Sequence, residues 1–508
     1  MFAMARSTQF LLVLLLFVSS GAVWTSNSSN GGGLKFCVAP NQYVYAPLFS
    51  TATTQIDQNL MVMQVLTETA LKHGLACLLV EKPFNNVNGS GKHNNWSLGT
   101  LCGTNLLNPA QVIKKTGNPL IFPVVLAALI RSADLHGDLM RMSVAAPGND
   151  FRLGACEAPP AIISTYLGNV TEYKSSTKPL DVGVPSIAPF SVPTEDRNRT
   201  SPFPYGGARF EFRAVGSTQN PSIVNTVLAT LAADGFREFA DKIEAGAKPA
   251  DVAAEALNNH WKVIFNGNGY SAEWPTEAIE RGVWEIDSGV GSMARMEADK
   301  NIALFESLNI LSREECEARA QIMCDHYSGT VEMEALCMID MINKQIIPAA
   351  TRFGFGDVAA LTAAAASVKA KLATVHHAEG YAKATIAREL RLETMMDARA
   401  VCDSAAGVIP WGLGFSGPRR VGGGGVAPFG TSWLLPERAP PPSPPLPGVA
   451  LSAPFVPPPP DGGRAFLSAP PPRPCGSMPG GKGSRPAPPP PLGLLLGGRS
   501  GGLHLSVL

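Results

Sequence analysis

Apolar side chains recur every three to four residues in several parts of the chain, which is the pattern of an amphipathic helix. The clearest case contains Ile56, Leu60 and Met63 and predicts a helix over 56–73, with Gly74 as its stop signal. Similar patterns predict three further helices, over 122–142, 302–347 and 358–406. From Ile223 to the end of the folded body near residue 410, the chain is rich in alanine and is expected to be mainly helical.

Two short segments have the pattern of β-strands. Residues 75–80 form a continuous apolar run that ends in a charged, proline-containing turn, which predicts a buried strand. Further along, apolar and polar residues alternate, so that Arg209, Glu211 and Arg213 lie on one face of a predicted strand. The stretch from 81 to 97 is rich in Asn and Gly and is expected to be a loop. The first half of the folded body therefore mixes helices and strands.

The two ends of the chain differ from this body. Arg6 precedes an apolar run at 10–18 that small residues follow, which is the order of a targeting signal. Such a signal favours a secretory or plastid-type location, whereas a wrongly chosen start exon would leave a cytoplasmic protein. Residues 411–508 contain more than half of the 44 prolines and cannot form a packed core, so we expect a disordered tail. Alternatively, the tail is a ligand for a proline-binding groove or a mis-spliced end of the gene model.

Composition excludes several classes of protein. The 41 basic and 41 acidic residues cancel, which argues against the extended basic surface of a nucleic-acid-binding protein. A hydrophobic content of 45% allows a large core, but only one short apolar run exists, so a multi-pass membrane protein is excluded. The 9 cysteines contain no C-x-x-C pair and indicate neither a zinc site nor a disulfide framework.

The stretch around His93 is the richest in candidate chemistry. A Gly-Ser-Gly-Lys run at 89–92 invites comparison with a phosphate-binding loop, but that motif needs Gly at 86 and Ser or Thr at 93. Asn86 and His93 stand there, so the comparison fails. What remains is a set of amides, glycines and one imidazole. It suits an anion or a metal, or it is only an Asn- and Gly-rich turn with a surface histidine.

A second set of candidates lies on the predicted strand, where Arg209 and Arg213 flank Glu211. Arginine binds carboxylates and phosphates through a bidentate fork. The three residues are therefore either a buried ion network or two anion-binding groups beside a metal ligand. Two further loops each carry an arginine, Arg152 in 152–160 and Arg199 in 198–202.

These segments, in this order, resemble the catalytic core of glutamine synthetase in its long type III form. The matching segments are 88–95, 152–160, 209–213, 264–271 and 390–395. The resemblance implies an α+β fold, with a curved antiparallel sheet and flanking helices followed by a helical C-terminal domain. The expected parts are a targeting-like segment (1–24), a linker (25–33), a partial catalytic domain (34–237), a helical C-terminal domain (238–410) and the tail (411–508).

The resemblance also implies a reaction and its residues. ATP would phosphorylate glutamate to γ-glutamyl phosphate, which ammonia would convert to glutamine with Mg²⁺ or Mn²⁺ as cofactor, in a homo-oligomeric ring. The implied metal ligands are His93 and Glu211. The implied catalytic residues are Glu157, Arg199 and Arg209. The implied glutamate-binding residues are Asn88, Gly89, Arg152 and Arg213. Ser97 would lie near the nucleotide.

The chain departs from the family pattern near its N-terminus. Cys37 and Val44 stand at the positions that match two metal-binding glutamates. Valine has no donor atom, and a thiolate is a poor ligand for hard Mg²⁺. The sequence also begins near the middle of the family pattern, as a truncated or mis-assembled record would. We therefore expect impaired activity in this chain, and the alternative is a non-catalytic glutamine synthetase-like subunit or binding paralogue.

Overall fold

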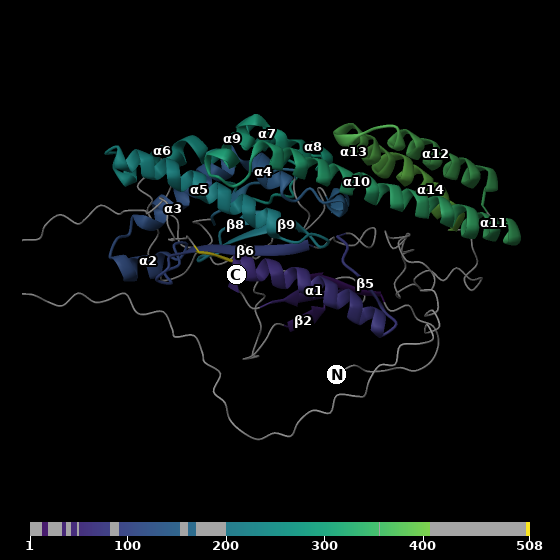
Figure 1. Ribbon diagram of the computed structural model, residues 1–508, viewed down its shortest axis with the longest axis horizontal. Coiled ribbons are helices and arrows are strands. Elements are labelled where there is room, and N and C mark those ends of the chain that lie inside the picture. The colour runs from purple at the N-terminus through teal and green to yellow at the C-terminus, as the bar shows by residue number, and fades with distance from the viewer. Residues whose placement is uncertain are drawn as a thin grey trace, which may run out of the picture. The chain divides into compact units, whose positions relative to one another are not determined.

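The structure of the protein is a computed structural model (Figure 1). It describes residues 13–18, 33–36, 42–47, 50–81, 91–152, 161–168, 200–354, 356–406 and 504–507. The strands are β1 (Val13–Val18), β2 (Gly33–Phe36), β3 (Gln42–Ala46), β4 (Ser50–Thr51), β5 (Ala76–Leu78), β6 (Gly91–Gly99), β7 (Thr165–Tyr166), β8 (Phe203–Pro204), β9 (Phe210–Gly216) and β10 (His504–Val507).

Helices dominate the described residues from Ser222 to Ala406. The α-helices are α1 (Ala52–Lys72), α2 (Pro109–Thr116), α3 (Ile121–Leu135), α4 (Gly137–Met142), α5 (Ser222–Glu244), α6 (Pro249–His260), α7 (Trp274–Arg281), α8 (Gly289–Met293), α9 (Asp299–Ser307), α10 (Arg313–Met341), α11 (Ile347–Phe353), α12 (Val358–His376), α13 (Gly380–Glu389) and α14 (Met395–Ala406). Short 3₁₀ turns are η1 (Pro147–Arg152), η3 (Trp261–Val263) and η4 (Ala294–Glu297). Two π-helical turns are η5 (Ile342–Ile346) and η6 (Leu390–Thr394).

The strands form small sheets. One has the order β2-β3-β1-β5 and is mixed, because β1 pairs parallel with β3 and β5 while β2 pairs antiparallel with β3. Another has the order β4-β10-β6-β9 and is antiparallel throughout. Strands β7 and β8 form a parallel pair. The predicted α+β class, with helices beside an antiparallel sheet and a helical second half, is confirmed.

The predictions for the two ends concern residues that mostly lie outside the described part. Within the targeting-like segment, Val13–Val18 form β1 between β3 and β5, and targeting stays a prediction. Within the predicted tail the structure describes His504–Val507, which form β10. This strand pairs with β4 on one side and β6 on the other, so backbone hydrogen bonds order a short segment that composition assigns to a tail.

The helices predicted over 122–142, 302–347 and 358–406 are each broken in the structure. The helix predicted over 122–142 is interrupted at His136, whose φ of −119° and ψ of 24° are not helical. The one predicted over 302–347 stops after α9, where Asn309 has a positive φ of 53°. It restarts at a capping box formed by Ser312 and Glu315. The spacing of apolar residues does not reveal these interruptions, because it carries no information about the polar residues that cap a helix.

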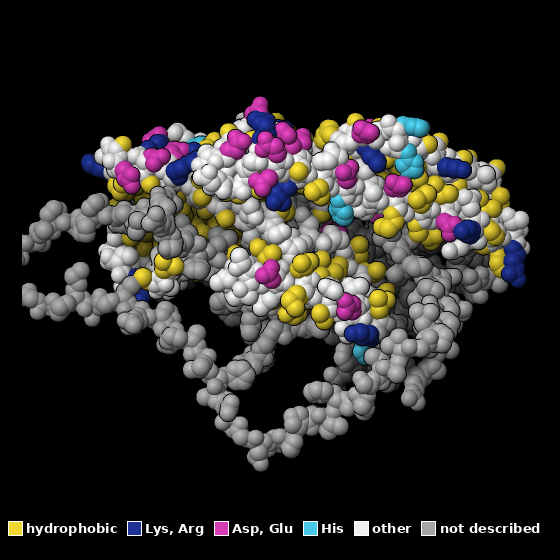
Figure 2. Space-filling model, viewed as in Figure 1, with side chains coloured by type: hydrophobic (Ala, Val, Ile, Leu, Met, Phe, Trp, Pro, Cys, Tyr) yellow, Lys and Arg dark blue, Asp and Glu magenta, His cyan; other side chains and the backbone are white. Residues whose placement is uncertain are grey.

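Helix α1 turns a different face inward from the one its apolar spacing predicts. Its buried residues are Ala52, Gln55, Asn59 and Ala70. The side chain of Asn220 donates to the carbonyl of Ile56 at 2.9 Å, so small residues and amides hold this helix in place. Four apolar side chains are instead more than half exposed: Leu60, Met61, Val65 and Leu71. Figure 2 shows hydrophobic side chains gathered over α1.

In the described part of the chain, the buried apolar side chains form two clusters. The first packs the β6–β9 ladder against α3, α5 and α6, and its centre is an aromatic stack in which Phe203 and Phe210 have ring centroids 4.7 Å apart. The second joins α10 to α14, the green helices of Figure 1. Helix α12 is long and apolar enough to cross a membrane by those two criteria alone. Its Leu361, Val368 and Leu372 are buried in the second cluster.

Candidate active site

The segment predicted as an Asn- and Gly-rich loop becomes a strand from Gly91 to Gly99, so the loop prediction is wrong there. Gly, Asn and Lys are poor strand formers because they pack badly on a pleated surface. Tertiary contacts override that preference in β6. Lys92 is fully buried and donates to backbone carbonyls, and Nδ2 of Asn94 donates to Oδ1 of Asn225 at 3.0 Å.

An irregularity in the β6–β9 ladder lies at the candidate site. Lys92 is opposite Val215 and Asn94 is opposite Phe212, so two residues of β9 face the single residue His93. That is the count of a β-bulge, which increases the local twist and redirects side chains. Bulges are common beside active sites, and this one includes His93, which contacts Glu211 of β9.

The two faces of this ladder have different chemistry. Trp96 and Phe210 lie on the core face, with ring centroids 5.8 Å apart. Because side chains alternate along a strand, His93 and Glu211 lie on the opposite face. They are partly exposed, with 21% and 18% of the side-chain surface accessible. The alternation of side chains along β6 and β9 thus gives the ladder one buried aromatic face and one polar, partly exposed face.

Three side chains contact one another on the polar face. Nδ1 of His93 lies 2.7 Å from Oε1 of Glu211, and Nη2 of Arg213 donates to Oε2 of Glu211 at 3.2 Å. Nη1 of Arg213 donates to the carbonyl of Ser201 at 3.3 Å, which helps to fix the guanidinium. Each oxygen of the Glu211 carboxylate therefore has a nitrogen partner.

Arg209 belongs to the same group through a neighbour on β6. Its Nε donates to Oδ1 of Asn95 at 2.8 Å, and Asn95 is opposite Glu211 in the ladder. Asn95 follows His93 by two residues, so both lie on the same face of β6. Sequence reasoning missed Asn95, although alternation along a strand would have indicated it.

Competing effects set the charge of Glu211. Burial raises the pKa of its carboxyl, because low-dielectric surroundings disfavour the charged form. The His93 imidazole and the Arg213 guanidinium lower it, and together they hold the pKa well below its usual range. The side chain is therefore an anion at neutral pH, as a ligand for a cation must be.

The structure brings together four of the residues predicted for the site, His93, Arg209, Glu211 and Arg213. Ser97 is buried on β6, opposite Ser506 of β10.

The other predicted positions are less fully described. Arg152 is the last residue of η1, and Val44 lies in β3. The remaining predicted residues lie outside the described part of the chain: Cys37, Asn88, Gly89, Glu157 and Arg199. Their roles stay predictions.

Two donors of the predicted metal site are in place, the imidazole of His93 and the carboxylate of Glu211. Among the described residues no group of three or more His, Cys, Asp or Glu side chains gathers at one point. Mg²⁺ usually keeps several waters and binds through one or two carboxylates plus substrate phosphates. The donor set therefore suits a divalent cation that substrate phosphates help to hold, and not a closed cage of protein ligands.

Sequence reasoning also missed the polar groups on the other side of β6. Nζ of Lys92 donates to the carbonyl of Ser217 at 2.7 Å, and burial lowers the pKa of this lysine to about 7 while Glu81 raises it. Glu81 is fully buried and accepts hydrogen bonds from the backbone N and Oγ1 of Thr218, at 3.0 and 2.6 Å. These groups tie β6 to the turn that follows β9.

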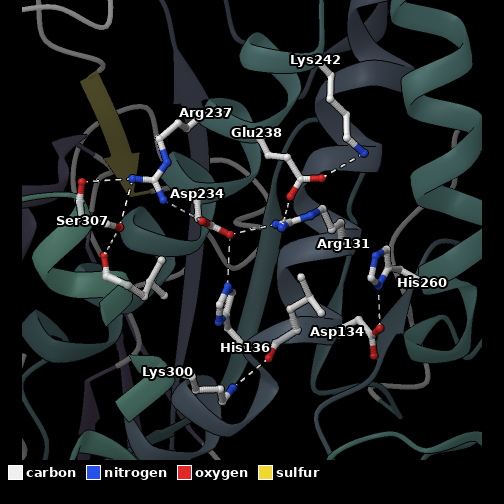
Figure 3. Close-up of polar contacts among 12 residues, drawn as sticks. Arg131, Asp134, His136, Asp234, Arg237, Glu238, Lys242, His260, Lys300 and Ser307 are labelled. Carbon is white, nitrogen blue, oxygen red and sulfur yellow. Dashed lines mark hydrogen bonds and ion pairs between the residues drawn. The ribbon is translucent and has the colours of Figure 1, made fainter. Parts of the chain in front are cut away.

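A second charged cluster lies on α3 and α5 (Figure 3). Asp234 accepts hydrogen bonds from Arg131 at 2.8 Å and Arg237 at 3.3 Å, and lies 3.2 Å from Nε2 of His136. Burial raises the pKa of the Asp234 carboxyl, but His136 and Arg131 outweigh it and hold the pKa well below its usual range. Every charge in this cluster has an opposite partner, so we assign it to the stability of the helical layer.

Comparison with known proteins finds two family models that match parts of the chain. Residues 35–116 match the family model of the glutamine synthetase catalytic domain, and residues 250–367 match that of the glutamine synthetase C-terminal domain. The first match includes His93 and Ser97, whereas Glu211 lies between the two matched segments.

Three curated relatives share a large part of the chain. The type-3 glutamine synthetase of Dictyostelium discoideum is 41% identical over 331 residues, 61% of this chain and 45% of the relative. The glutamine synthetase of Butyrivibrio fibrisolvens is 38% identical over 331 residues, 61% of this chain and 46% of the relative. That of Bacteroides fragilis is 34% identical over 339 residues, 62% of this chain and 46% of the relative.

The aligned regions thus span less than half the length of these relatives. The family matches bracket the strand that carries Glu211 and continue into the helical second half. Two separate parts of the chain thus match glutamine synthetase family models, and the proteins it is similar to include a type-3 glutamine synthetase.

Proposed function

We propose that this protein is a glutamate–ammonia ligase, which makes glutamine from glutamate, ammonium and ATP. The γ-carboxylate of glutamate would attack the terminal phosphorus of ATP, releasing ADP and forming γ-glutamyl phosphate. Ammonia would then displace phosphate from the acyl carbon and lose a proton. The observation that carries the proposal is the contact of His93, Glu211 and Arg213 on one face of the β6–β9 ladder, within a chain related to glutamine synthetases.

The charges of this face suit ATP chemistry. A divalent cation, Mg²⁺ or Mn²⁺, bound by His93 and Glu211 would neutralise phosphate charge. Arg209, whose guanidinium is steadied by Asn95, would add positive charge beside the transferring phosphoryl group, together with Arg199. Phosphoryl transfer depends mainly on such positioning and charge, which is what these side chains supply.

Other residues would bind and enclose the amino acid. Arg213 and Arg152 suit the carboxylates of glutamate because a guanidinium pairs with a carboxylate through two hydrogen bonds. Asn88 and Gly89 would add further hydrogen bonds to glutamate, and Glu157 would exclude water and accept a proton from ammonium. In the family's ring assembly these sites would lie within an oligomer, which is also part of the proposal.

A specific observation favours a second candidate. Cys37 and Val44 occupy the positions that resemble two metal-binding glutamates. The chain therefore lacks two carboxylate charges that would hold a second cation. The second candidate is therefore a non-catalytic subunit or paralogue that binds ATP or glutamate without turnover.

The full chain, incubated with Mg²⁺ or Mn²⁺, distinguishes these candidates through glutamate- and ammonium-dependent ADP release. The ligase proposal expects release that needs both substrates, and γ-glutamyl hydroxamate when hydroxylamine replaces ammonium. Binding of glutamate or a non-hydrolysable ATP analogue without turnover supports the second candidate. If the wild-type chain does not turn over and the double variant Cys37→Glu plus Val44→Glu does, the missing carboxylates are the cause of the lost activity. A chain that binds neither ligand contradicts both candidates.

A further inference from the structure

The turn η1 lies between the candidate active site and the helical second half of the chain. It begins at Pro147 and ends at Arg152, which is among the residues proposed to bind glutamate. It packs against α10 and α8. Four consecutive residues, Pro147 to Asp150, each contact a different part of the structure.

The sheet holds the turn from one side. Nδ2 of Asn149 donates to the carbonyl of Ala214, in the bulge of β9, at 3.3 Å and to the carbonyl of Val144 at 2.8 Å. Glu81 closes the space beside Gly148, because a β-carbon built on this glycine would overlap Oε2 of the glutamate. The turn is therefore fitted against the same bulge that lies beside His93.

The helical domain holds the turn from the other side. The hydroxyl of Tyr327, on α10, donates to Oδ2 of Asp150 at 2.5 Å. Arg391, on η6, donates from Nη1 to the carbonyl of Pro147. Tyr327 is fully buried and Arg391 is 4% exposed, so neither contact competes with bulk water.

Both donors are themselves fixed. Nε and Nη2 of Arg391 each lie 2.8 Å from a different oxygen of Glu334, so the guanidinium forms a two-pronged ion pair. Burial raises the pKa of the Tyr327 hydroxyl and the Asp150 charge raises it further, so the tyrosine stays a proton donor. The second oxygen of Asp150 accepts from the backbone N of Gly289 at 3.2 Å. The turn thus meets rigid partners, not mobile surface side chains.

We propose that Tyr327 and Arg391 are positioning residues, through which the helical C-terminal domain holds η1 and so places Arg152 for glutamate. The inference rests on the proposed function for its ligand. It assigns the helical domain a part in substrate binding that does not require any of its side chains to touch the substrate. A turn anchored on one side only would let the backbone of Arg152 shift relative to β9. Loss of the contacts that orient metal ligands typically costs about 10–100-fold in affinity or activity, and we expect an effect at the lower end of that range here.

The test uses the full chain and three conservative variants. Tyr327→Phe removes one hydroxyl, and Arg391→Lys keeps the charge but cannot reach Glu334 and Pro147 together. Tyr381→Phe, the same change at a half-exposed tyrosine of α13, is the matched control. Hydrogen–deuterium exchange is followed in peptides covering 147–152 and, as a reference, 358–376. Dissociation constants are measured for glutamate and for a non-hydrolysable ATP analogue.

The proposal expects exchange in 147–152 to be about 10-fold faster in Tyr327→Phe and Arg391→Lys, with the reference peptide unchanged. Glutamate binding is expected to weaken about 10-fold while binding of the ATP analogue stays within about twofold. Tyr381→Phe is expected to behave as the wild type. Unchanged exchange in η1, or equal weakening of both ligands, overturns the inference.

The outcome stays separable from that of the proposed function. If Arg391→Lys does not fold, the isosteric Tyr327→Phe decides alone. If the wild-type chain binds no glutamate, the proposed function fails on that result. Exchange in 147–152 then still decides whether the helical domain holds Arg152: faster exchange in the variants supports it, and wild-type exchange overturns it.

Discussion

Nδ1 of His93, on β6, lies 2.7 Å from Oε1 of Glu211, on β9. The two residues are far apart in the sequence, and the antiparallel pairing of β6 with β9 brings them together. A contact of this length is a charge-assisted hydrogen bond, and it holds the imidazole and the carboxylate on one side of a bulge. Arg213 takes the other carboxylate oxygen, so the pair is part of a fixed group of charges.

Replacing Glu211 by glutamine tests whether its charge is used in the reaction. The amide has nearly the same shape but cannot be an anionic metal ligand, so we expect kcat to fall about 100-fold or more, as for loss of other preorganised charge-stabilising groups. Steady-state ADP release at saturating substrates is the measurement. Glu280→Gln, the same change at an exposed position of α7, is expected to leave kcat unchanged. Wild-type turnover in Glu211→Gln would contradict the assignment.

The buried amine of Lys92 is expected to contribute strongly to stability. Lys92→Met leaves the carbonyls at the end of β9 without their donor and removes the basic group that interacts with Glu81, so unfolding should be easier by about 1–3 kcal/mol. Urea denaturation measures the change. Lys369→Met, at an exposed position of α12, should change stability by less than about 0.5 kcal/mol.

A double variant separates the charge from the packing of Lys92. In Lys92→Met plus Glu81→Gln no buried carboxylate is left uncompensated, so the loss should be smaller than the sum of the two single losses, by about 1–2 kcal/mol. Strict additivity of the two losses would mean that Glu81 and Lys92 do not interact.

Local patterns of the sequence predicted the elements but not how they meet. The helix over 56–73 and the shared face of Arg209, Glu211 and Arg213 follow from spacing alone. The proximity of His93 and Glu211 followed from a family resemblance, because strand pairing is a long-range property that spacing within one segment does not contain.

The errors have identifiable physical causes. Lys92 and Asn94 are predicted to lie in a loop because their residue types are uncommon in strands. In the structure both are buried, and their polar groups form hydrogen bonds with backbone carbonyls and with the side-chain amide of Asn225. The break before α10 was visible in the sequence as the capping box of Ser312 and Glu315, but apolar periodicity continues past it. Anchoring of η1 by Tyr327 depends on tertiary packing, and no local signal indicated it.

Acid should weaken the helical layer through Asp234. Its carboxyl has a folded-state pKa well below the unfolded value of 3.8, so its stabilising effect is complete above about pH 5 and is lost as pH falls through 4 toward the folded pKa. Asp234→Asn should therefore cost about 2 kcal/mol near pH 7 and flatten the dependence of unfolding free energy on pH below 5. Asp241→Asn, at an exposed position of α5, should keep the wild-type slope. If the unfolding free energy of Asp234→Asn depends on pH as steeply as that of the wild type, other carboxylates dominate acid unfolding.

Two glycine-to-alanine changes should have opposite effects on stability. At Gly148 the added methyl group would overlap the buried carboxylate of Glu81, so we expect a loss of about 1–3 kcal/mol. At Gly329, inside α10, the methyl group would meet nothing within 4 Å, so better helix propensity should give a gain of about 0.5–1 kcal/mol. Thermal and urea unfolding of the two variants side by side provides the comparison. Because the chemical change is identical, a loss at both positions would contradict the open surroundings of Gly329, and a gain at both would contradict the tight contact between η1 and Glu81.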